Sequence, residues 1–404
     1  MSLMEAIGAS MGPVGMGKKV PFVMASLTEH GQRIAGVNSR LMYDDVDVNT
    51  EIACLTAEYF NDYPSFSWDV YNFEARALGQ NVVYGEYGLP DIDTRTHLIT
   101  SEADLDKIKW PTENPLDSGR YPLWLKQIEV ANRYFPYQPS VFPAVSSFTL
   151  ACFLCGFPEF MRMTKKNPDL AHEIMRRIVD DIHAPLVKAV AERVPSAHFL
   201  LADAWEMIPN VSPKFQKEFV WLYYDRLREK TEGVTNGPVA WYMTYGEGFM
   251  PDKKAYLQAK IPYNFSIQCT HTEDCPDSIY HELALETGLP FNVYIPAVVI
   301  QSSTKEEIIE YVRKVAKEMR PGVDKFTWIG MCPAAASSQQ LKAVQAAGQA
   351  FSALPCPTAE EFDKIQVEVP EFEETFEEFC HRKARENTEG YTFNWLDQAT
   401  FPKH

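Results

Sequence analysis

The sequence predicts one α/β domain over residues 1–404, built as a (β/α)₈ barrel. From about residue 138 onward, short β-rich runs alternate with longer amphipathic segments, which is the pattern of βα units around a parallel sheet. The short runs are dense in Val, Ile and aromatic residues, as parallel strands buried on both faces are. The chain length of 404 residues suits a barrel of about 250 residues or more that carries extra segments.

Eight strands are expected in chain order. The first two lie at 19–27 and 65–70, with a helix over 48–61 between them. The other six are expected at 140–147, 197–203, 239–245, 263–269, 291–300 and 325–331.

Helices are expected between these strands as crossover connections. Residues 168–193 form one of them, because apolar side chains recur at intervals of four from Leu170 to Ile182. Residues 305–319 form another, and Ser303 and Thr304 before two glutamates predict its N-terminal cap.

Three segments lie outside the regular alternation. An N-terminal extension precedes the first strand, and residues 80–138 form an insertion with many Pro, Asp, Gly and Tyr residues. We expect this insertion to lie over the barrel mouth with only short elements of its own. Residues 355–404 form an acidic C-terminal extension, and its run PEFEETFEEF predicts a solvated helix.

Composition excludes several classes of function. The net charge of -17, with no basic run to offset it, opposes binding to nucleic acid. No stretch approaches the roughly 20 consecutive apolar residues that cross a bilayer, and the N-terminus lacks the order of an export signal. The eight cysteines show no disulfide-scaffold spacing, so we expect free thiols in a cytoplasmic protein.

Side chains at the ends of barrel strands converge on one mouth, so strand position identifies the candidate site residues. The polar and aromatic side chains at these positions are His30, Trp68, Asp69, Asp203, Tyr242, Tyr245, Glu247, Cys269, His271 and Cys332.

Several pieces in order resemble the uroporphyrinogen decarboxylase-like superfamily, and within it the corrinoid-dependent methyltransferases. They are KKVPFVMASLTEHGQRIAG, SWDVYNFEARALG, SFTLACF, LADAW, GLPFNVYIP and FTWIGMCPAAASSQQLKA, and the resemblance covers most of residues 19–350. It implies a (β/α)₈ barrel with its active site at the carboxyl ends of the strands.

The sequence departs from two patterns of this superfamily. The decarboxylase clusters arginines after its first strand, whereas MASLTEHGQR here contains only Arg33. Thiol methyltransferases bind zinc through a His-x-Cys pair and a distant Cys; Cys332 matches the distant Cys, but Tyr242, Met243 and Thr244 replace the pair. The resemblance therefore favours the branch that removes methyl groups from aryl methyl ethers.

Ether cleavage requires that the leaving phenolate be protonated or bound to a Lewis acid. We assign acid-base roles to His30, because imidazole titrates near neutral pH, and to Asp203, Tyr242 and Glu247. A second interpretation, left open, is that Asp203 caps the following helix.

Other side chains are assigned to substrate or metal. The aromatic and acidic side chains expected to bind the substrate are Trp68, Asp69, Tyr71 and Tyr245. The candidate zinc ligands are Glu247, Cys269, His271 and Cys332. The alternative for Cys269 is a thiol packed among apolar groups, and Cys152 with Cys155 is read as a buried helix face.

The leading hypothesis is an enzyme that moves a methyl group from a methoxylated aromatic to a corrinoid protein, with zinc as an optional cofactor. The predicted partners are a small aromatic methyl ether, a corrinoid protein and, in a homodimer, a second copy of the chain. The alternatives are a decarboxylase of the uroporphyrinogen type and a non-catalytic barrel that binds a tetrapyrrole or corrinoid.

Overall fold

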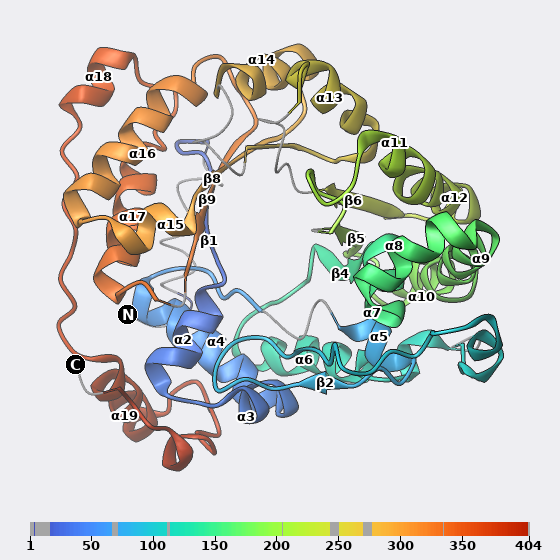
Figure 1. Cartoon of the computed structure of the whole chain (residues 1–404). Coiled ribbons are helices and arrows are strands. Elements are labelled where there is room, and N and C mark those ends of the chain that lie inside the picture. Colours follow the sequence, from blue (N-terminus) through green and yellow to red (C-terminus); the bar gives the residue numbers. More distant parts are fainter. Residues whose placement is uncertain are drawn as a thin grey trace.

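The computed structural model describes Met4 and residues 17–66, 72–110, 114–203, 205–242, 250–269, 277–333 and 335–402. For residues 240–242, 277 and 278 it describes the backbone alone. The elements form a ring in which the strands line the inside and the helices lie outside them (Figure 1).

Two parallel sheets form the inner wall. One has the order β4-β5-β6, and the other has the order β1-β9-β8-β7. Because the first strand pairs with the last, the sheet returns on itself as a closed barrel requires. The strands are β1 (Phe22–Ala25), β4 (Val141–Val145), β5 (His198–Asp203), β6 (Pro238–Tyr242), β7 (Ile267–Cys269), β8 (Phe291–Ile295) and β9 (Phe326–Met331).

These strands match the prediction in place and direction. Each of the seven lies at a predicted position, and the eighth predicted strand at 65–70 overlaps residues 67–71, which lie outside the described part. The strand predicted at 291–300 stops at Ile295, since Pro296 has no backbone N–H and a helix follows it.

The outer helices of the first half include α4, which was predicted at 48–61. These helices are α2 (Leu27–Ala35), α3 (Ser39–Asp44), α4 (Val46–Phe60), α5 (Phe73–Ala77), α6 (Tyr121–Tyr134), α7 (Ser147–Cys155), α8 (Phe157–Lys166), α9 (Pro168–Arg177) and α10 (Ala184–Arg193). A π-helical segment, η3 (Ile178–His183), joins α9 to α10 and completes the helix predicted at 168–193.

The second half continues the same alternation. Its helices are α11 (Pro213–Gln216), η4 (Lys217–Trp221), α12 (Leu222–Lys230), α13 (Lys253–Lys260), α14 (Asp277–Thr287), α15 (Ala297–Ser302), α16 (Lys305–Met319), α17 (Ser338–Ala350), α18 (Ala359–Lys364) and α19 (Phe376–Glu386). Helix α16 has the predicted bounds, and Thr304 and Glu307 form its capping box.

Strand periodicity decides which side chains face the helices. Along β9, Phe326 and Trp328 are buried while Thr327 and Ile329 are only half-buried. Phe326 and Trp328 belong to an apolar cluster shared with α16 and α17, which therefore fills the layer between strands and helices. A second cluster fills the same layer outside β4 and β5.

The insertion at 80–138 is more regular than predicted. It contains a short antiparallel pair, β2 (Val82–Val83) with β3 (Asp91–Ile92), and then the 14-residue helix α6. This helix packs against α4, where Gln127 donates a hydrogen bond of 2.7 Å to Asn49. The expectation of only short elements was wrong, because α6 presents an apolar face to the core.

The C-terminal extension is also packed rather than solvated. Phe376 and Phe379 of α19 are buried against α2 and α4, so the predicted solvated helix was wrong. The acidic run suggested exposure because it contains many glutamates, but in α19 the glutamates lie on the exposed face and the phenylalanines on the buried face. Beyond α19, Glu51 of α4 accepts hydrogen bonds from the Trp395 indole and from the Phe393 amide, both at 3.1 Å.

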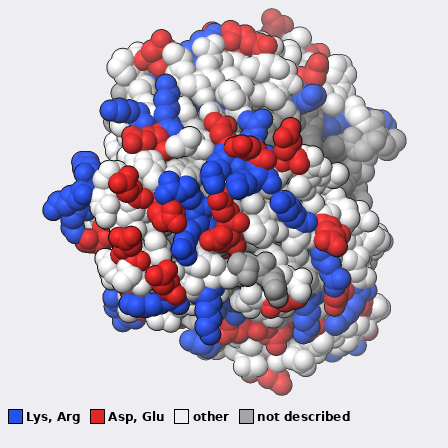
Figure 2. Space-filling model, turned by 90° about the vertical axis from the view of Figure 1, so that its right-hand side faces the viewer, with Lys and Arg blue, Asp and Glu red and all other residues white. Residues whose placement is uncertain are grey.

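The described surface mixes charges of both signs. On the face shown in Figure 2, basic and acidic side chains are interspersed. Ion pairs such as Arg176–Glu173 and Lys317–Asp363 join neighbouring side chains on the outer helices. Among the described residues, no helix combines the length and apolar character needed to cross a bilayer.

A buried ion pair fixes the C-terminal extension and can be tested. Lys383 of α19 lies 2.9 Å from Glu58 of α4, and both side chains are almost fully buried. We expect Lys383→Met to lower the free energy of unfolding by about 3 kcal/mol, because it leaves Glu58 buried without its cation. Urea denaturation measures this, and the double variant Lys383→Met/Glu58→Leu should recover most of the loss. A change below about 1 kcal/mol in the single variant would contradict the proposed anchor.

Candidate active site at the strand ends

The carboxylate of Asp203 lies at the end of β5, and both of its oxygens accept hydrogen bonds. Its Oδ1 accepts hydrogen bonds from the Thr149 hydroxyl at 2.7 Å and from the amides of Trp205 and Glu206 at 3.0 Å. Its Oδ2 accepts a hydrogen bond from the hydroxyl of Ser146, at the end of β4. One carboxylate thus joins the ends of two neighbouring strands to the turn that follows β5.

Burial raises the pKa of Asp203 above its ordinary value, although the four hydrogen bonds oppose the rise. Asp203 is 1% exposed, and a buried carboxyl group with a raised pKa is suited to proton transfer. Its bonds to two successive amides also match the capping interpretation. The described geometry favours a positioning role for Asp203, and its acid-base role stays a prediction.

A second buried carboxylate follows Asp203 and was missed by the sequence analysis. Glu206 lies 3.1 Å from the ammonium group of Lys260, and both side chains are at most 1% exposed. Gln216 donates to Glu206 and exchanges hydrogen bonds with the Tyr256 hydroxyl. No pattern marks these residues in advance, because Lys260 ends an ordinary amphipathic helix and the pair is distant in sequence.

The two candidate thiol ligands point into the apolar layer. Cys269 ends β7 and Cys332 follows β9, and both belong to the core cluster between the strands and the outer helices. Burial raises the pKa of the Cys332 thiol well above its ordinary value, and the carboxylates of Asp62 and Glu29 raise it further. Cys269 is buried in this cluster, and its role as a zinc ligand stays a prediction; Cys152 and Cys155 are buried in α7, as expected.

The structure describes only two of the four predicted zinc ligands, so zinc binding stays a prediction. Among the described residues, no three His, Cys, Asp or Glu side chains lie close enough together to hold a metal ion. The other two predicted ligands, Glu247 and His271, lie outside the described residues. We therefore derive no chemical step that depends on zinc.

His30 lies on α2, one turn after the first strand. Its Nε2 is 3.1 Å from the Ser338 hydroxyl at the start of α17, and its ring meets Phe60 edge-on. Burial, and then the charge of Arg33, lower the pKa of His30 to about 4. His30 is therefore neutral at pH 7 and titrates well below the range that we expected.

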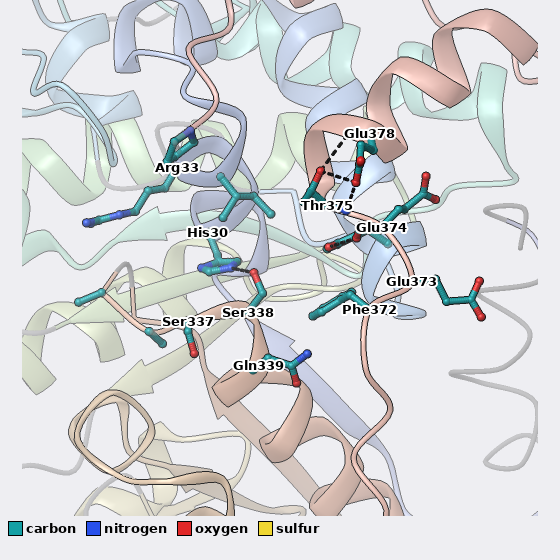
Figure 3. Close-up of a pocket in the computed structure, with 15 residues that line it drawn as sticks. His30, Arg33, Ser337, Ser338, Gln339, Phe372, Glu373, Glu374, Thr375 and Glu378 are labelled. Atoms are coloured by element: carbon teal, nitrogen blue, oxygen red, sulfur yellow. Dashed lines mark hydrogen bonds between the residues drawn. The ribbon is translucent and has the colours of Figure 1, made fainter. Parts of the chain in front are cut away.

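His30 also lines a pocket of about 590 Å³ among the outer elements α2, α4 and α17 and the C-terminal segment. Figure 3 shows His30 and Ser338 turned toward one another, with Arg33 extending to one side and Glu373 to the other. Ile34 and Phe372 form apolar parts of the pocket wall. The pocket therefore has the size and the mixed polar and apolar lining of a small-molecule site.

Most of the other predicted site residues cannot be placed. Trp68, Asp69, Tyr71 and Tyr245 lie outside the described residues, as do Glu247 and His271. The backbone of Tyr242 pairs with that of Asp203 across β5 and β6, so these two positions share one level of the mouth. The roles assigned to these side chains stay predictions.

The segments that follow the strands in sequence are poor in positive charge. Between the end of each barrel strand described above and the helix after it, or in the first turns of α2, the only Lys or Arg is Arg33, until Lys253 begins α13. The same segments of the sequence carry the acids Glu29, Glu206, Glu247, Asp252, Glu273 and Asp274. Segments of this composition repel polyanions but not neutral molecules.

Two comparisons with known proteins agree with this architecture. The family described as Uroporphyrinogen decarboxylase (URO-D) matches residues 17–264, more than half of the chain. A solved structure of a methyltransferase from Methanosarcina mazei superposes with a TM-score of 0.63 at 17% sequence identity, covering 87% of this chain and 99% of that chain. No curated protein matches the sequence. At such low identity the structural likeness shows a shared fold.

The positioning role of Asp203 predicts a large loss of stability on truncation. Asp203→Ala leaves two hydroxyls and two amides without their acceptor, which should lower the free energy of unfolding by about 2–4 kcal/mol in urea titrations. Asp180→Ala is the matched control, since its ion pair with Arg226 is partly exposed and is worth at most about 1 kcal/mol. Equal effects of the two substitutions would contradict the role of Asp203.

The low pKa of His30 predicts an acid-dependent loss of stability. The unfolded chain binds a proton at His30 below its ordinary pKa of 6.5, but the folded protein does so only below about 4. The free energy of unfolding should therefore fall by about 2 kcal/mol more between pH 7 and pH 5 in the wild type than in His30→Gln. The exposed His198→Gln is the control. An identical pH dependence in wild type and His30→Gln would show that His30 titrates normally.

Proposed function

The chain belongs to the uroporphyrinogen decarboxylase family, and from this membership we propose that it is an enzyme that transfers a methyl group from a methoxylated aromatic compound to a corrinoid protein. The scarcity of positive charge after the barrel strands carries the proposal. A porphyrinogen with many carboxylates needs several cations for binding, and Arg33 alone does not provide them. A neutral aromatic ether has no such requirement.

The structural likeness provides a precedent for methyl transfer on this fold. The protein from Methanosarcina mazei is a methyltransferase, and nearly all of its chain superposes on this one. An enzyme of this kind can receive its corrinoid with the partner protein, so no described residue has to hold it. When the partner docks, the corrinoid supplies the nucleophile that accepts the methyl group.

This chain would bind the aromatic ring and protonate the departing oxygen. Trp68, Tyr71 and Tyr245 are the proposed ring contacts, because flat apolar surfaces with a polar edge suit a substituted arene. Tyr242 and Glu247 are the proposed proton donors, since a phenolate leaves readily only when its oxygen is protonated. Asp203 would keep the ends of β4 and β5 in place around them, through its bonds to Ser146 and the Glu206 amide.

The proposal is tested with the purified full chain, a panel of methoxyarenes and free cob(I)alamin under anaerobic conditions. We expect methylcobalamin, followed by its absorbance, and one phenol for each methyl group transferred. Glu247→Gln and Tyr242→Phe should each lower the rate about 10²–10⁴-fold by removing a proton donor. Tyr223→Phe is the control, because its hydroxyl bonds His172 on the outer helices.

Two results would replace the proposal with an alternative. Release of carbon dioxide from uroporphyrinogen without methyl transfer would identify a decarboxylase. Tight binding of a tetrapyrrole or corrinoid without any turnover would identify a binding protein. In either case neither the wild type nor Glu247→Gln would transfer a methyl group.

A further inference from the structure

A closed polar cluster lies behind strand β4, where α5, α6, α7 and η3 meet. It consists of Glu74, Tyr121, Ser147 and His183, and the first two and His183 are 0% exposed. The Ser147 hydroxyl lies 3.1 Å from His183 Nδ1, and the Val145 amide donates to Glu74 Oε1 at 3.1 Å. His183 Nε2 lies 3.8 Å from Glu74 Oε1, which is beyond a direct hydrogen bond.

Three atoms of this cluster have no hydrogen-bond partner among the described residues. They are Glu74 Oε2, His183 Nε2 and the Tyr121 hydroxyl. A buried polar atom left without a partner costs about 1–3 kcal/mol, and most such atoms in folded proteins are paired with protein or with ordered water. Glu74 lies beside His183 and acts electrostatically on Tyr121, so the three atoms belong to one neighbourhood.

Local sequence explains how His183 reaches this position. Pro185 has no backbone N–H and cannot complete an ordinary helical turn, and the helix widens into the π-helical segment η3 just before it. The segment ends at His183, and the ring is directed toward Ser147 and Glu74. Nothing in the proposed methyl-transfer chemistry uses this histidine.

The protonation states favour a neutral partner. Burial raises the pKa of Glu74 to about 8 and lowers the pKa of His183 to about 3, so both are neutral at pH 7. Burial and the nearby Glu74 raise the pKa of Tyr121, which also stays neutral. Asp203 is the next ionisable group along the strand ends, and its oxygens already have partners on β4, α7 and the turn after β5. A cation would lack a compensating charge here.

We propose that an internal water molecule binds between Glu74 Oε2, His183 Nε2 and the Tyr121 hydroxyl. A water molecule both donates and accepts, so it satisfies these atoms whichever ring nitrogen of His183 carries the proton. It would connect α5 and α6 to His183, which contacts Ser147. Ser147 directly follows Ser146, whose hydroxyl donates a hydrogen bond to Asp203. The bound water thus holds the insertion on the end of β4, independently of the reaction at the mouth.

The first test is a crystal structure of the full chain at a resolution that shows ordered water. We expect one water molecule at about 2.7–3.2 Å from the three atoms. An infrared band of a protonated carboxyl group at pH 7, absent in Glu74→Gln, should accompany it. An empty space, a bound cation, or an ionised Glu74 in that spectrum would each overturn the proposal.

The second test is a double-mutant cycle in solution. Tyr121→Phe and Glu74→Gln should be coupled, changing the unfolding equilibrium constant together by about fivefold or more beyond the product of their single effects. This coupling would arise through the shared water, since the two side chains have no hydrogen bond to one another. Tyr391→Phe removes another buried hydroxyl, in a different core cluster, and should be additive with Glu74→Gln. Additivity of Tyr121→Phe with Glu74→Gln would contradict a shared water.

Discussion

The hydrogen bonds of Asp203 hold the ends of β4 and β5 together. Parallel strands β4 and β5 end side by side, and their last residues need partners that the sheet no longer supplies. Asp203 provides an acceptor for the hydroxyl of Ser146 and for the amides of the turn after β5. The segments that enter the mouth therefore begin from a fixed frame, although they differ in sequence and length.

Buried polar groups continue from this frame in both directions. On one side, Ser147 leads to His183 and Glu74, and on the other, Glu206 leads to Lys260. Polar groups in such surroundings are retained only where each finds a partner, so these networks fix the geometry more strictly than apolar packing alone does. The proposed chemistry would thus take place above a rigid layer, and substrate choice would depend on the segments that follow it.

Strand positions were predicted well because buried parallel strands have a local signature. The runs 197–203 and 325–331 alternate with amphipathic helices, and Thr304 capped α16 as its sequence indicated. The sequence could not show the packing of α19, since an acidic amphipathic helix looks the same whether its aromatic face is buried or not. Its partners on α4 lie more than 300 residues earlier in the chain.

The site was harder to predict than the fold. The position of residues at strand ends selected Asp203, but it also selected Cys269. The side chain of Cys269 faces the helices, because successive side chains along a strand point to opposite faces of the sheet. The ion pair of Glu206 and Lys260 was not predicted, because the two residues lie on separate elements that come together only on folding. His30 follows β1 in sequence as expected, but its side chain lines a pocket among the outer helices, and its pKa depends on burial that no short motif encodes.

The contact between Glu51 and the C-terminal Trp395 has a consequence for biosynthesis. The two residues are separated by 344 positions in the sequence. Strand β1 likewise pairs with β9, which is synthesised much later. A ribosome releases the N-terminal part of the chain well before either partner exists, so α4 emerges with a carboxylate whose final ligands have not yet been made. Closure of the ring therefore has to wait until β9 and Trp395 have left the exit tunnel, and until then the unpaired edge of β1 is a site for aggregation.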